Sequence, residues 1–236
     1  MTVLITGTSA GVGFGLAHYY LEKGETVFGI SRNRNETLDS FSNFRFLSQD
    51  LVKYDEVPGS LAGFLEGVSQ LDLVILNAGV VSKINDLKDT SLEEIRRVMD
   101  INVWSNKVLI DALFETVPGI GQVVGISSGA SVSGSRGWNA YSLSKAALNM
   151  LIELYAKEHA ETHFISLAPG IIDTGMQDYI YTIEEEEKFP VVQKLKSLKG
   201  TDNMPSPEAA APGIAAAISK LERFESGSFQ DVRDIQ

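Results

Sequence analysis

Cysteine is absent from the 236-residue chain. Its absence excludes a disulfide scaffold, thiolate zinc sites, iron–sulfur ligation and a cysteine nucleophile. Basic residues are also scarce, because 20 lysines and arginines stand against 31 aspartates and glutamates, which gives a formal net charge of −11. No cluster of basic residues offsets this charge locally. We therefore expect neither nucleic acid nor an anionic lipid surface as a partner.

Long apolar runs are missing as well. No stretch approaches the roughly 20 residues that a membrane span requires, so no membrane partner is expected. The first residues lack the basic segment of a signal peptide, and a cytoplasmic protein is expected. Apolar residues make up 44% of the chain and charged residues 22%, which are ordinary globular values. This composition excludes a disordered, collagen-like or coiled-coil chain.

Short apolar, β-branched runs alternate along the chain with longer helical patterns. The expected strands are Thr2–Thr6, Thr26–Ser31, Phe44–Ser48, Leu73–Leu76, Gln122–Ser127, His163–Leu167 and Phe229–Val232. The expected helices are Val12–Lys23, Val57–Ser69, Leu92–Thr116, Ala140–His159 and Pro207–Phe224. Most of the strands are too apolar to have a solvent face. The alternation predicts one α/β domain over residues 1–236, a Rossmann-type doubly wound parallel sheet of about seven strands with helices on both faces.

The segment Asp173–Met204 fits this alternation poorly. It contains the acidic run Glu184–Glu187 and then the amphipathic stretch Val191–Leu198. Long excursions from a compact domain are usually lids or binding loops. We expect a substrate lid around residues 173–204, over one end of the sheet.

Glycines follow the first expected strand in the run Thr6-Gly7-Thr8-Ser9-Ala10-Gly11-Val12-Gly13. Glycines at a strand-to-helix turn let the backbone approach a pyrophosphate, whose charge the free N–H groups at the helix N-terminus can meet. A tight turn that needs positive φ is the alternative for the glycines alone. Their position between a strand and a helix favours the phosphate site.

Tyr141 and Lys145 are four residues apart on a helical pattern, so their side chains share one face. A nearby lysine cation favours the phenolate and is expected to lower the pKa of the tyrosine toward the range of efficient proton transfer. Ser128 ends an expected strand, at the edge where open α/β sheets bind ligands, and can donate a hydrogen bond to a substrate carbonyl oxygen. A packed tyrosine and a solvated lysine would also explain the pair taken alone.

These motifs occur in the order typical of the short-chain dehydrogenase/reductase family, which the chain resembles from Thr6 to Met176. The glycine run resembles the family's Thr-Gly-x-x-x-Gly-x-Gly motif. The resemblance also covers Asp50-Leu51, Asn77-Ala78-Gly79 and the segment Pro169–Met176. It implies that NADP(H) is bound by Gly7, Ser9, Gly11, Val12, Gly13, Asp50, Leu51, Asn77, Ala78, Gly79, Tyr141, Lys145, Pro169, Gly170, Ile172 and Thr174.

The same resemblance implies that Ser128, Tyr141, Lys145 and Asn102 are catalytic. In the family, an asparagine at the position of Asn102 kinks its helix and holds a water that links the lysine to bulk solvent. A polar residue tolerated inside a helix is the alternative for Asn102.

Further segments resemble one branch of the family, the sepiapterin reductases and bacterial benzil reductases. They are Ser127–Ala130 with Gly137–Tyr141, Ala168–Gln177 and Phe224–Asp231. The branch implies hydride transfer to a ketone or vicinal dicarbonyl, with Trp138 and Asp231 at the substrate. Asp231 would anchor a pterin, and a structural role is its alternative. The branch also implies a homodimer packed through the fourth and fifth helices of the fold, or a tetramer.

The coenzyme preference depends on the end of the second expected strand. In dinucleotide folds an acidic residue there binds the ribose 2′-hydroxyl and repels a 2′-phosphate. Here Ser31 ends the strand and Arg32-Asn33-Arg34 follow it, so NADPH is favoured, with Arg32 on the phosphate. Solvated loop arginines are the alternative. Ala10 departs from the basic residue that sepiapterin reductases often carry at that position.

Two other functions stay open, a non-catalytic dinucleotide-binding sensor and a nucleotide-sugar epimerase or dehydratase. Sensors commonly lose the catalytic tyrosine or lysine, and both residues are present here. Epimerases usually have a longer C-terminal substrate domain and a differently spaced glycine motif. No metal site is expected, because the pattern changes to a strand at His163, which separates it from His159.

Overall fold

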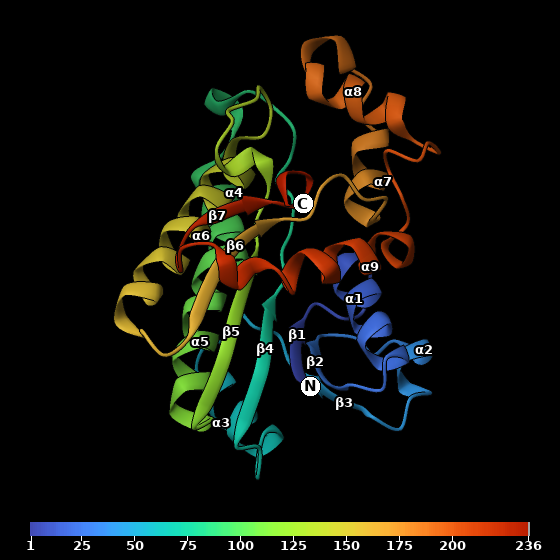
Figure 1. Cartoon of the computed structure of the whole chain (residues 1–236). Coiled ribbons are helices and arrows are strands. Elements are labelled where there is room, and N and C mark those ends of the chain that lie inside the picture. The colour runs from blue at the N-terminus through green and yellow to red at the C-terminus, as the bar shows by residue number, and fades with distance from the viewer. Residues whose placement is uncertain (236) are drawn as a thin grey trace.

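The computed structural model describes residues 1–235. Its strands form one sheet in the order β3-β2-β1-β4-β5-β6-β7 (Figure 1). All neighbouring strands are parallel. The strands are β1 (Thr2–Thr6), β2 (Thr26–Ser31), β3 (Phe44–Ser48), β4 (Gln70–Leu76), β5 (Gly119–Ile126), β6 (His163–Ala168) and β7 (Phe229–Asp231). The prediction of a doubly wound α/β fold with about seven strands is confirmed.

Helices cover both faces of the sheet. One face is covered by α1 (Gly11–Glu22), α2 (Glu36–Asp39) and α9 (Pro207–Ile218). The other face is covered by α3 (Val57–Phe64), α5 (Ser105–Thr116) and α6 (Asn139–Glu158). Among residues 1–235, no helix is both long enough and apolar enough to cross a membrane.

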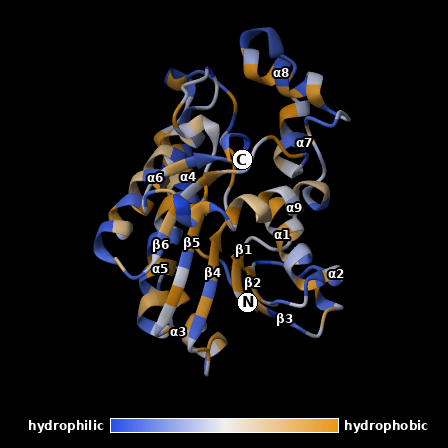
Figure 2. Cartoon of the chain, viewed as in Figure 1, coloured by the Kyte–Doolittle hydropathy of each residue, from blue (hydrophilic) through white to orange (hydrophobic). Residues whose placement is uncertain are grey.

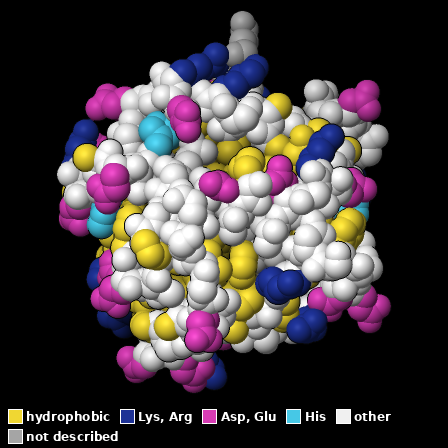
Figure 3. All heavy atoms as spheres, turned by 60° about the horizontal axis from the view of Figure 1, so that its bottom comes forward, with side chains coloured by type: hydrophobic (Ala, Val, Ile, Leu, Met, Phe, Trp, Pro, Cys, Tyr) yellow, Lys and Arg dark blue, Asp and Glu magenta, His cyan; other side chains and the backbone are white. Residues whose placement is uncertain are grey.

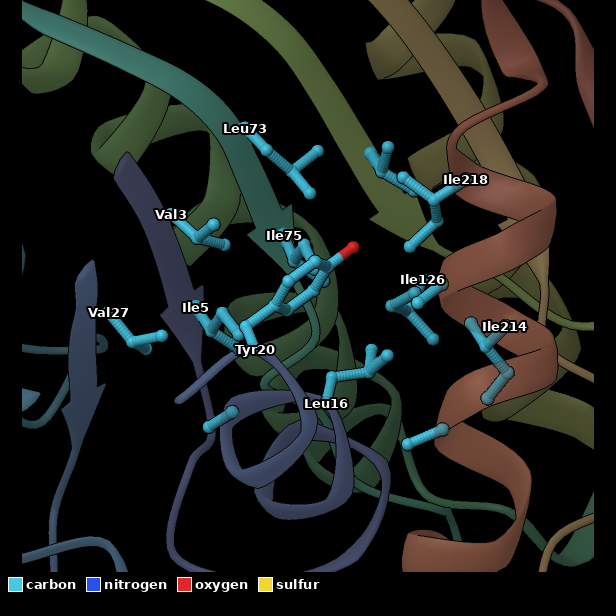
Figure 4. Close-up of a cluster of buried hydrophobic side chains, with 14 of the residues drawn as sticks. Val3, Ile5, Leu16, Tyr20, Val27, Leu73, Ile75, Ile126, Ile214 and Ile218 are labelled. Atoms are coloured by element: carbon cyan, nitrogen blue, oxygen red, sulfur yellow. The ribbon is translucent and has the colours of Figure 1, made fainter. Parts of the chain in front are cut away.

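Because both faces of the sheet are buried, its strands are apolar at successive positions. Val3 and Ile5 of β1 belong to the cluster under α1 and α9, whereas Leu4 belongs to the cluster on the opposite face. Successive side chains of a strand point to opposite faces, so all three positions must be apolar. Figure 4 shows Ile5 beside Tyr20 of α1, with Leu16 of α1 between Tyr20 and Ile214 of α9. Figure 2 shows the hydrophobic colouring along β1 and β4 in the middle of the sheet.

The charged side chains lie outside these clusters. Figure 3 shows one face of the molecule, over which acidic side chains are scattered among lysines and arginines. The acidic excess of the sequence is therefore spread over this face rather than gathered in one patch.

The predicted helix over Leu92–Thr116 is interrupted. α4 (Leu92–Met99) gives way to a π-helical turn over Asp100–Trp104, and α5 begins at Ser105. Asn106 Nδ2 donates a 2.9 Å hydrogen bond to the carbonyl oxygen of Asn102 inside this turn. Single π turns within helices are frequent at functional sites.

Two other predicted helices are shorter than expected, and one short helix was not predicted. The predicted helix Val57–Ser69 ends at Phe64, because Gly67 takes a φ of 80° that a continuing helix does not allow. The predicted helix Pro207–Phe224 ends at Ile218 and is followed by a separate 3₁₀ turn over Leu221–Arg223. The short helix α2 was not predicted; its N-cap is Asn35, whose side chain accepts two backbone N–H bonds.

The segment 173–204 contains α7 (Gly175–Tyr181) and α8 (Pro190–Leu198). Figure 1 shows both helices standing beyond the sheet, at the upper right. Ile180, Phe189 and Val192 in this segment pack in one apolar cluster with Trp138 and Tyr141. The segment is therefore fixed against the helix that carries the predicted catalytic tyrosine.

Candidate active site

A cleft of about 830 Å³ lies where the loops after β1, β4, β5 and β6 meet. These loops all leave the carboxyl ends of parallel strands. The chain order of the strands reverses between β1 and β4, which are neighbours in the sheet. Open parallel α/β sheets bind ligands at this switch point.

The glycine run forms a close-fitting turn at one side of the cleft. Gly7 and Gly11 take φ values of 75° and 62°, which L side chains rarely adopt. A Cβ atom on Gly13 would lie 2.4 Å from both Asn77 Nδ2 and the carbonyl oxygen of Gly7. The N-cap residue of α1, Ala10, makes no side-chain cap hydrogen bond. The open N-terminus and the absence of Cβ atoms fit the pyrophosphate of a dinucleotide.

Thr6 joins this turn to the loop after β4. Its Oγ1 accepts 2.9 Å hydrogen bonds from the backbone N–H groups of Asn77 and Ala78. Asn77 Nδ2 donates in return to the carbonyl oxygen of Thr6 at 2.9 Å. Asn77 therefore braces the loop through its side chain. Thr6 belongs to the glycine motif but was not predicted as a site residue, because its hydrogen-bond partners lie in a loop that is distant in sequence.

The other end of the cleft contains Arg32, Asp50 and Leu51. The two arginines after β2 differ in their contacts. Arg34 pairs with Asp39 at 2.9 Å and stacks over the ring of Phe46. Arg32 is exposed, lines the cleft and forms no ion pair among the described residues. A guanidinium without a local carboxylate fits a 2′-phosphate.

Tyr141 and Lys145 lie on α6, and both side chains reach into the cleft from the helix face that the spacing predicted. Ser128 follows β5, and its Oγ accepts a 3.2 Å hydrogen bond from the N–H group of Ala130. Burial raises the pKa of the Tyr141 phenol, and a hydrogen bond with Ser128 lowers it to a smaller extent. The net shift is upward, because the phenolate loses hydration in the buried site. The prediction that Lys145 lowers this pKa is thus wrong for the free protein.

The ammonium group of Lys145 is held between two loops. Nζ donates a 2.7 Å hydrogen bond to the carbonyl oxygen of Ile126, at the end of β5. It lies 5.8 Å from the ring centroid of Tyr141. A Cβ on Gly79 would lie 3.6 Å from Nζ and 3.1 Å from Asn102 Oδ1, so this glycine lies against both side chains. Burial lowers the pKa of Lys145 to about 8, which leaves it mainly protonated at neutral pH.

Asn102 lies in the π-helical turn, so its helix is interrupted where the resemblance implied a kink. Its Oδ1 accepts from the N–H group of Val80 at 2.8 Å, and its Nδ2 donates to Ser144 Oγ at 2.9 Å. The Ser144 hydroxyl donates in turn to the carbonyl oxygen of Tyr141 at 2.8 Å. Asn102 therefore links the loop after β4 to the helix that carries the tyrosine.

Trp138 and Asp231 both line the cleft, as do the remaining coenzyme residues predicted after β6, Pro169, Gly170, Ile172 and Thr174. The ring centroid of Trp138 lies 5.7 Å from that of Tyr141. Trp138 Nε1 and Gln177 Oε1 are buried and have no hydrogen-bond partner among residues 1–235. Gln177, which also lines the cleft, was not predicted as a site residue.

Asp231 is engaged by a residue that sequence reasoning missed. Its Oδ1 accepts from Nε of Arg233 at 2.8 Å, and its Oδ2 accepts from Nη2 at 2.5 Å. Hydrogen bonds from this guanidinium hold the pKa of the Asp231 carboxyl below its ordinary value. The two-residue spacing after β7 is the only signal in the sequence for this pair.

The cleft is our candidate for the site of a dinucleotide-dependent oxidoreductase, because the glycine turn, Ser128, Tyr141 and Lys145 all border it. The chain matches the family model described as short chain dehydrogenase over residues 1–185, and it belongs to this family. The predicted family and oxidoreductase class are confirmed.

Relatives agree with this assignment, and a solved structure agrees with the fold. The chain is 30% identical to the benzil reductase ((S)-benzoin forming) of Bacillus subtilis, over 98% of both chains. It is 32% identical to the NADPH-dependent pterin aldehyde reductase of Arabidopsis thaliana, over 74% of this chain and 76% of that one. The crystal structure of a short-chain dehydrogenase/reductase from Saccharomyces cerevisiae matches 99% of this chain and 96% of that one, with a TM-score of 0.86 and 23% identity.

Proposed function

We propose that the protein is an NADPH-dependent carbonyl reductase that acts on ketones or vicinal dicarbonyls. The observation that carries the proposal is the placement of Ser128, Tyr141 and Lys145 around one cleft that also contains the glycine cradle. The names of the relatives from Bacillus subtilis and Arabidopsis thaliana support the same chemistry.

The coenzyme would extend along the cleft. The cradle Gly7–Gly13 would hold the pyrophosphate, Asp50 and Leu51 would lie at the adenine, and Arg32 would bind the 2′-phosphate. Lys145 and the segment after β6 would hold the nicotinamide end. Bound NADPH supplies the hydride that reaches the substrate carbonyl carbon.

The protein's own groups act on the carbonyl oxygen. The hydroxyls of Ser128 and Tyr141 would donate hydrogen bonds to it, and the negative charge that develops there would strengthen both bonds. Tyr141 would then transfer its proton to the oxygen. The ordinary pKa of a tyrosine already keeps the phenol protonated at neutral pH, the form that a general acid requires, and burial raises this pKa further in the free protein. The Lys145 ammonium would stabilise the phenolate that remains. A water held at Asn102 would return the proton to the site.

Two features of the surroundings belong to the same proposal. The segment 173–204, which packs against Trp138 and Tyr141, would act as a substrate lid. Leu143, Met150 and Leu154 of α6 are more than half exposed. Their exposure supports a homodimer through the interrupted helix α4–α5 and through α6, which are the fourth and fifth helices when α4 and α5 are counted as one. A tetramer is the alternative to this homodimer. A cytoplasmic location and a small-molecule carbonyl substrate complete the proposal.

Incubation of the protein with NADPH and a panel of diketones and pterins tests the proposal. The loss of the ultraviolet absorbance of the reduced nicotinamide measures turnover. A carbonyl reductase consumes NADPH only when a carbonyl substrate is present. A dinucleotide sensor would bind NADPH without consuming it, and a nucleotide-sugar epimerase would convert its sugar with no net loss. Binding without consumption across the panel would contradict the proposal.

A further inference from the structure

Two basic side chains of the cleft have no part in the proposed reaction. The basic residues that line the cleft are Arg32, Arg97, Lys145, Lys194 and Arg233. Arg32 and Lys145 are assigned to the coenzyme and the chemistry, and Arg97 pairs with Glu94 at 2.9 Å. Lys194 and Arg233 remain. Their position needs an explanation, because the chain as a whole has a net charge of −11.

Arg233 lies close to the predicted catalytic serine. Its Nη2 is 3.9 Å from the place where a Cβ of Gly129 would lie, and Gly129 directly follows Ser128. Its side chain is 65% exposed, whereas that of Asp231 is 9% exposed. Asp231 therefore holds the guanidinium from the buried side, through Nε and Nη2. Among the described residues, no acceptor is bonded to Nη1, so this nitrogen can donate to a ligand.

Lys194 approaches the same cleft from α8. It is exposed and has no ion-pair partner within residues 1–235. Lys196 on the same helix instead pairs with Glu186 at 2.9 Å and does not line the cleft. The helix thus directs one lysine to a carboxylate of its own segment and the other to the cleft.

Apart from the residues assigned to the coenzyme and the chemistry, and from the pair of Arg97 with Glu94, the charges that line the cleft do not cancel. Two cations, Lys194 and Arg233, stand against one carboxylate, Asp231. The other acidic residue that lines the cleft, Asp50, follows β3 at the predicted adenine end. A neutral diketone would leave this positive charge unused. A guanidinium fork with a free edge suits a carboxylate, which accepts two parallel hydrogen bonds.

We propose that Arg233 and Lys194 form a subsite for a carboxylate, so that the substrates are keto acids whose carboxylate lies beyond the reacting carbonyl. This inference rests on the proposed reductase function. Asp231 is then a positioning residue that orients Arg233, in place of the pterin anchor that the resemblance implied.

Matched pairs of substrates test the subsite. Benzoylformate and 4-carboxybenzil are each compared with their methyl esters, which lack the negative charge and carry one more methyl group. The carboxylate of 4-carboxybenzil lies farther from the carbonyl, so its ester changes the reactivity of that carbonyl less. With NADPH, at least one acid should exceed its ester by about fivefold in kcat/KM, mainly through a lower KM. High salt should reduce that ratio, because the charges are partly exposed to solvent.

Variants assign the preference to its residues. Arg233→Gln should bring the acid down to the level of its ester and leave the ester within about twofold of the wild type. Lys194→Gln should have a smaller effect in the same direction, and Arg233→Lys should restore part of the preference. Arg223→Gln is the matched control, because Arg223 stacks on Phe224 and does not line the cleft. Calorimetry of benzoylformate and methyl benzoylformate with the NADP⁺ complex gives a readout independent of turnover, because the oxidised coenzyme has no hydride to transfer.

The outcomes separate the two proposals. Reduction of the esters without any preference for the acids would overturn the carboxylate subsite and leave the reductase intact. An Arg233→Gln variant that loses acid and ester equally would also overturn it, since Arg233 would then only hold the C-terminal segment. Failure to reduce any of the four carbonyl compounds would instead contradict the proposed function.

Discussion

The side-chain amide of Asn102 forms hydrogen bonds with both the N–H group and the carbonyl oxygen of Val80. Asn102 Oδ1 accepts the N–H group at 2.8 Å, and Asn102 Nδ2 donates to the carbonyl oxygen at 2.9 Å. Asn102 is fully buried. The bonds fix the loop after β4 against the π-helical turn, and this loop borders both the glycine cradle and Lys145.

Asn102→Ala should therefore reduce stability as well as activity. The change leaves two backbone groups of Val80 without partners, and each such group costs about 1–3 kcal/mol. Urea unfolding should show a loss of about 2–4 kcal/mol. Asn33→Ala, in an exposed loop, is the control and should change little. A variant of unchanged stability that loses turnover would contradict a bracing role and favour a role limited to the water.

The residues of the site were predictable where their signal is local. The glycine run and the four-residue spacing of Tyr141 and Lys145 place side chains through the geometry of a single turn or helix. The pair of Asp231 with Arg233 and the bonds from Thr6 to the loop after β4 depend on how distant segments meet, so only the structure shows them. The direction of the pKa shift of Tyr141 was wrong for the same reason. The motif indicates a nearby cation but not the extent of burial.

The fold was likewise predictable only where the sequence carries a local signal. Apolar strands predicted the parallel sheet, because burial on both faces requires them. The π-helical turn at Asp100–Trp104 was not predicted from the residues. Asn106 donates a hydrogen bond to the carbonyl oxygen of Asn102 inside the turn, but a polar residue at this position does not by itself indicate a π-helical turn.

Gly13→Ala should weaken coenzyme binding strongly. The added methyl group would meet Asn77 Nδ2 and the carbonyl oxygen of Gly7 at 2.4 Å, so the turn must open. Calorimetry should show NADPH binding weakened by more than about tenfold. Gly59→Ala in α3 is the matched control, because no atom lies within 4 Å of its Cβ position. Normal NADPH affinity in a folded Gly13→Ala protein would contradict the assigned cradle.

Arg32→Ala should remove most of the preference for NADPH. The wild type should favour NADPH over NADH by at least about tenfold in kcat/KM, because a charge-assisted phosphate contact contributes about 1.5–3 kcal/mol. The variant should weaken the reaction with NADPH alone. Arg34→Ala, which removes the pair with Asp39, should keep the preference. Equal use of both coenzymes by the wild type would show that Arg32 does not select the phosphate.

Lys145→Met should change the pH dependence of stability. Burial lowers the pKa of Lys145 from 10.5 to about 8, so the wild type must bury a cation below that pH. Between the two values the unfolded chain binds the proton and the folded protein does not, so the penalty fades as pH rises. The stability of the variant relative to the wild type should therefore decrease between about pH 8 and about pH 10.5. Lys107→Met, at an exposed lysine paired with Asp111, should show no such trend. A flat difference for Lys145→Met would contradict the lowered pKa.

The central claim is that Tyr141 delivers the proton in an NADPH-dependent carbonyl reduction, and the turnover of Tyr141→Phe with NADPH and benzil tests it most directly. The phenol acts mainly in the transition state, so kcat should fall by about 10²–10⁴-fold while the calorimetric affinity for NADPH stays nearly unchanged. A Tyr141→Phe enzyme that keeps more than about a tenth of the wild-type kcat would contradict the account.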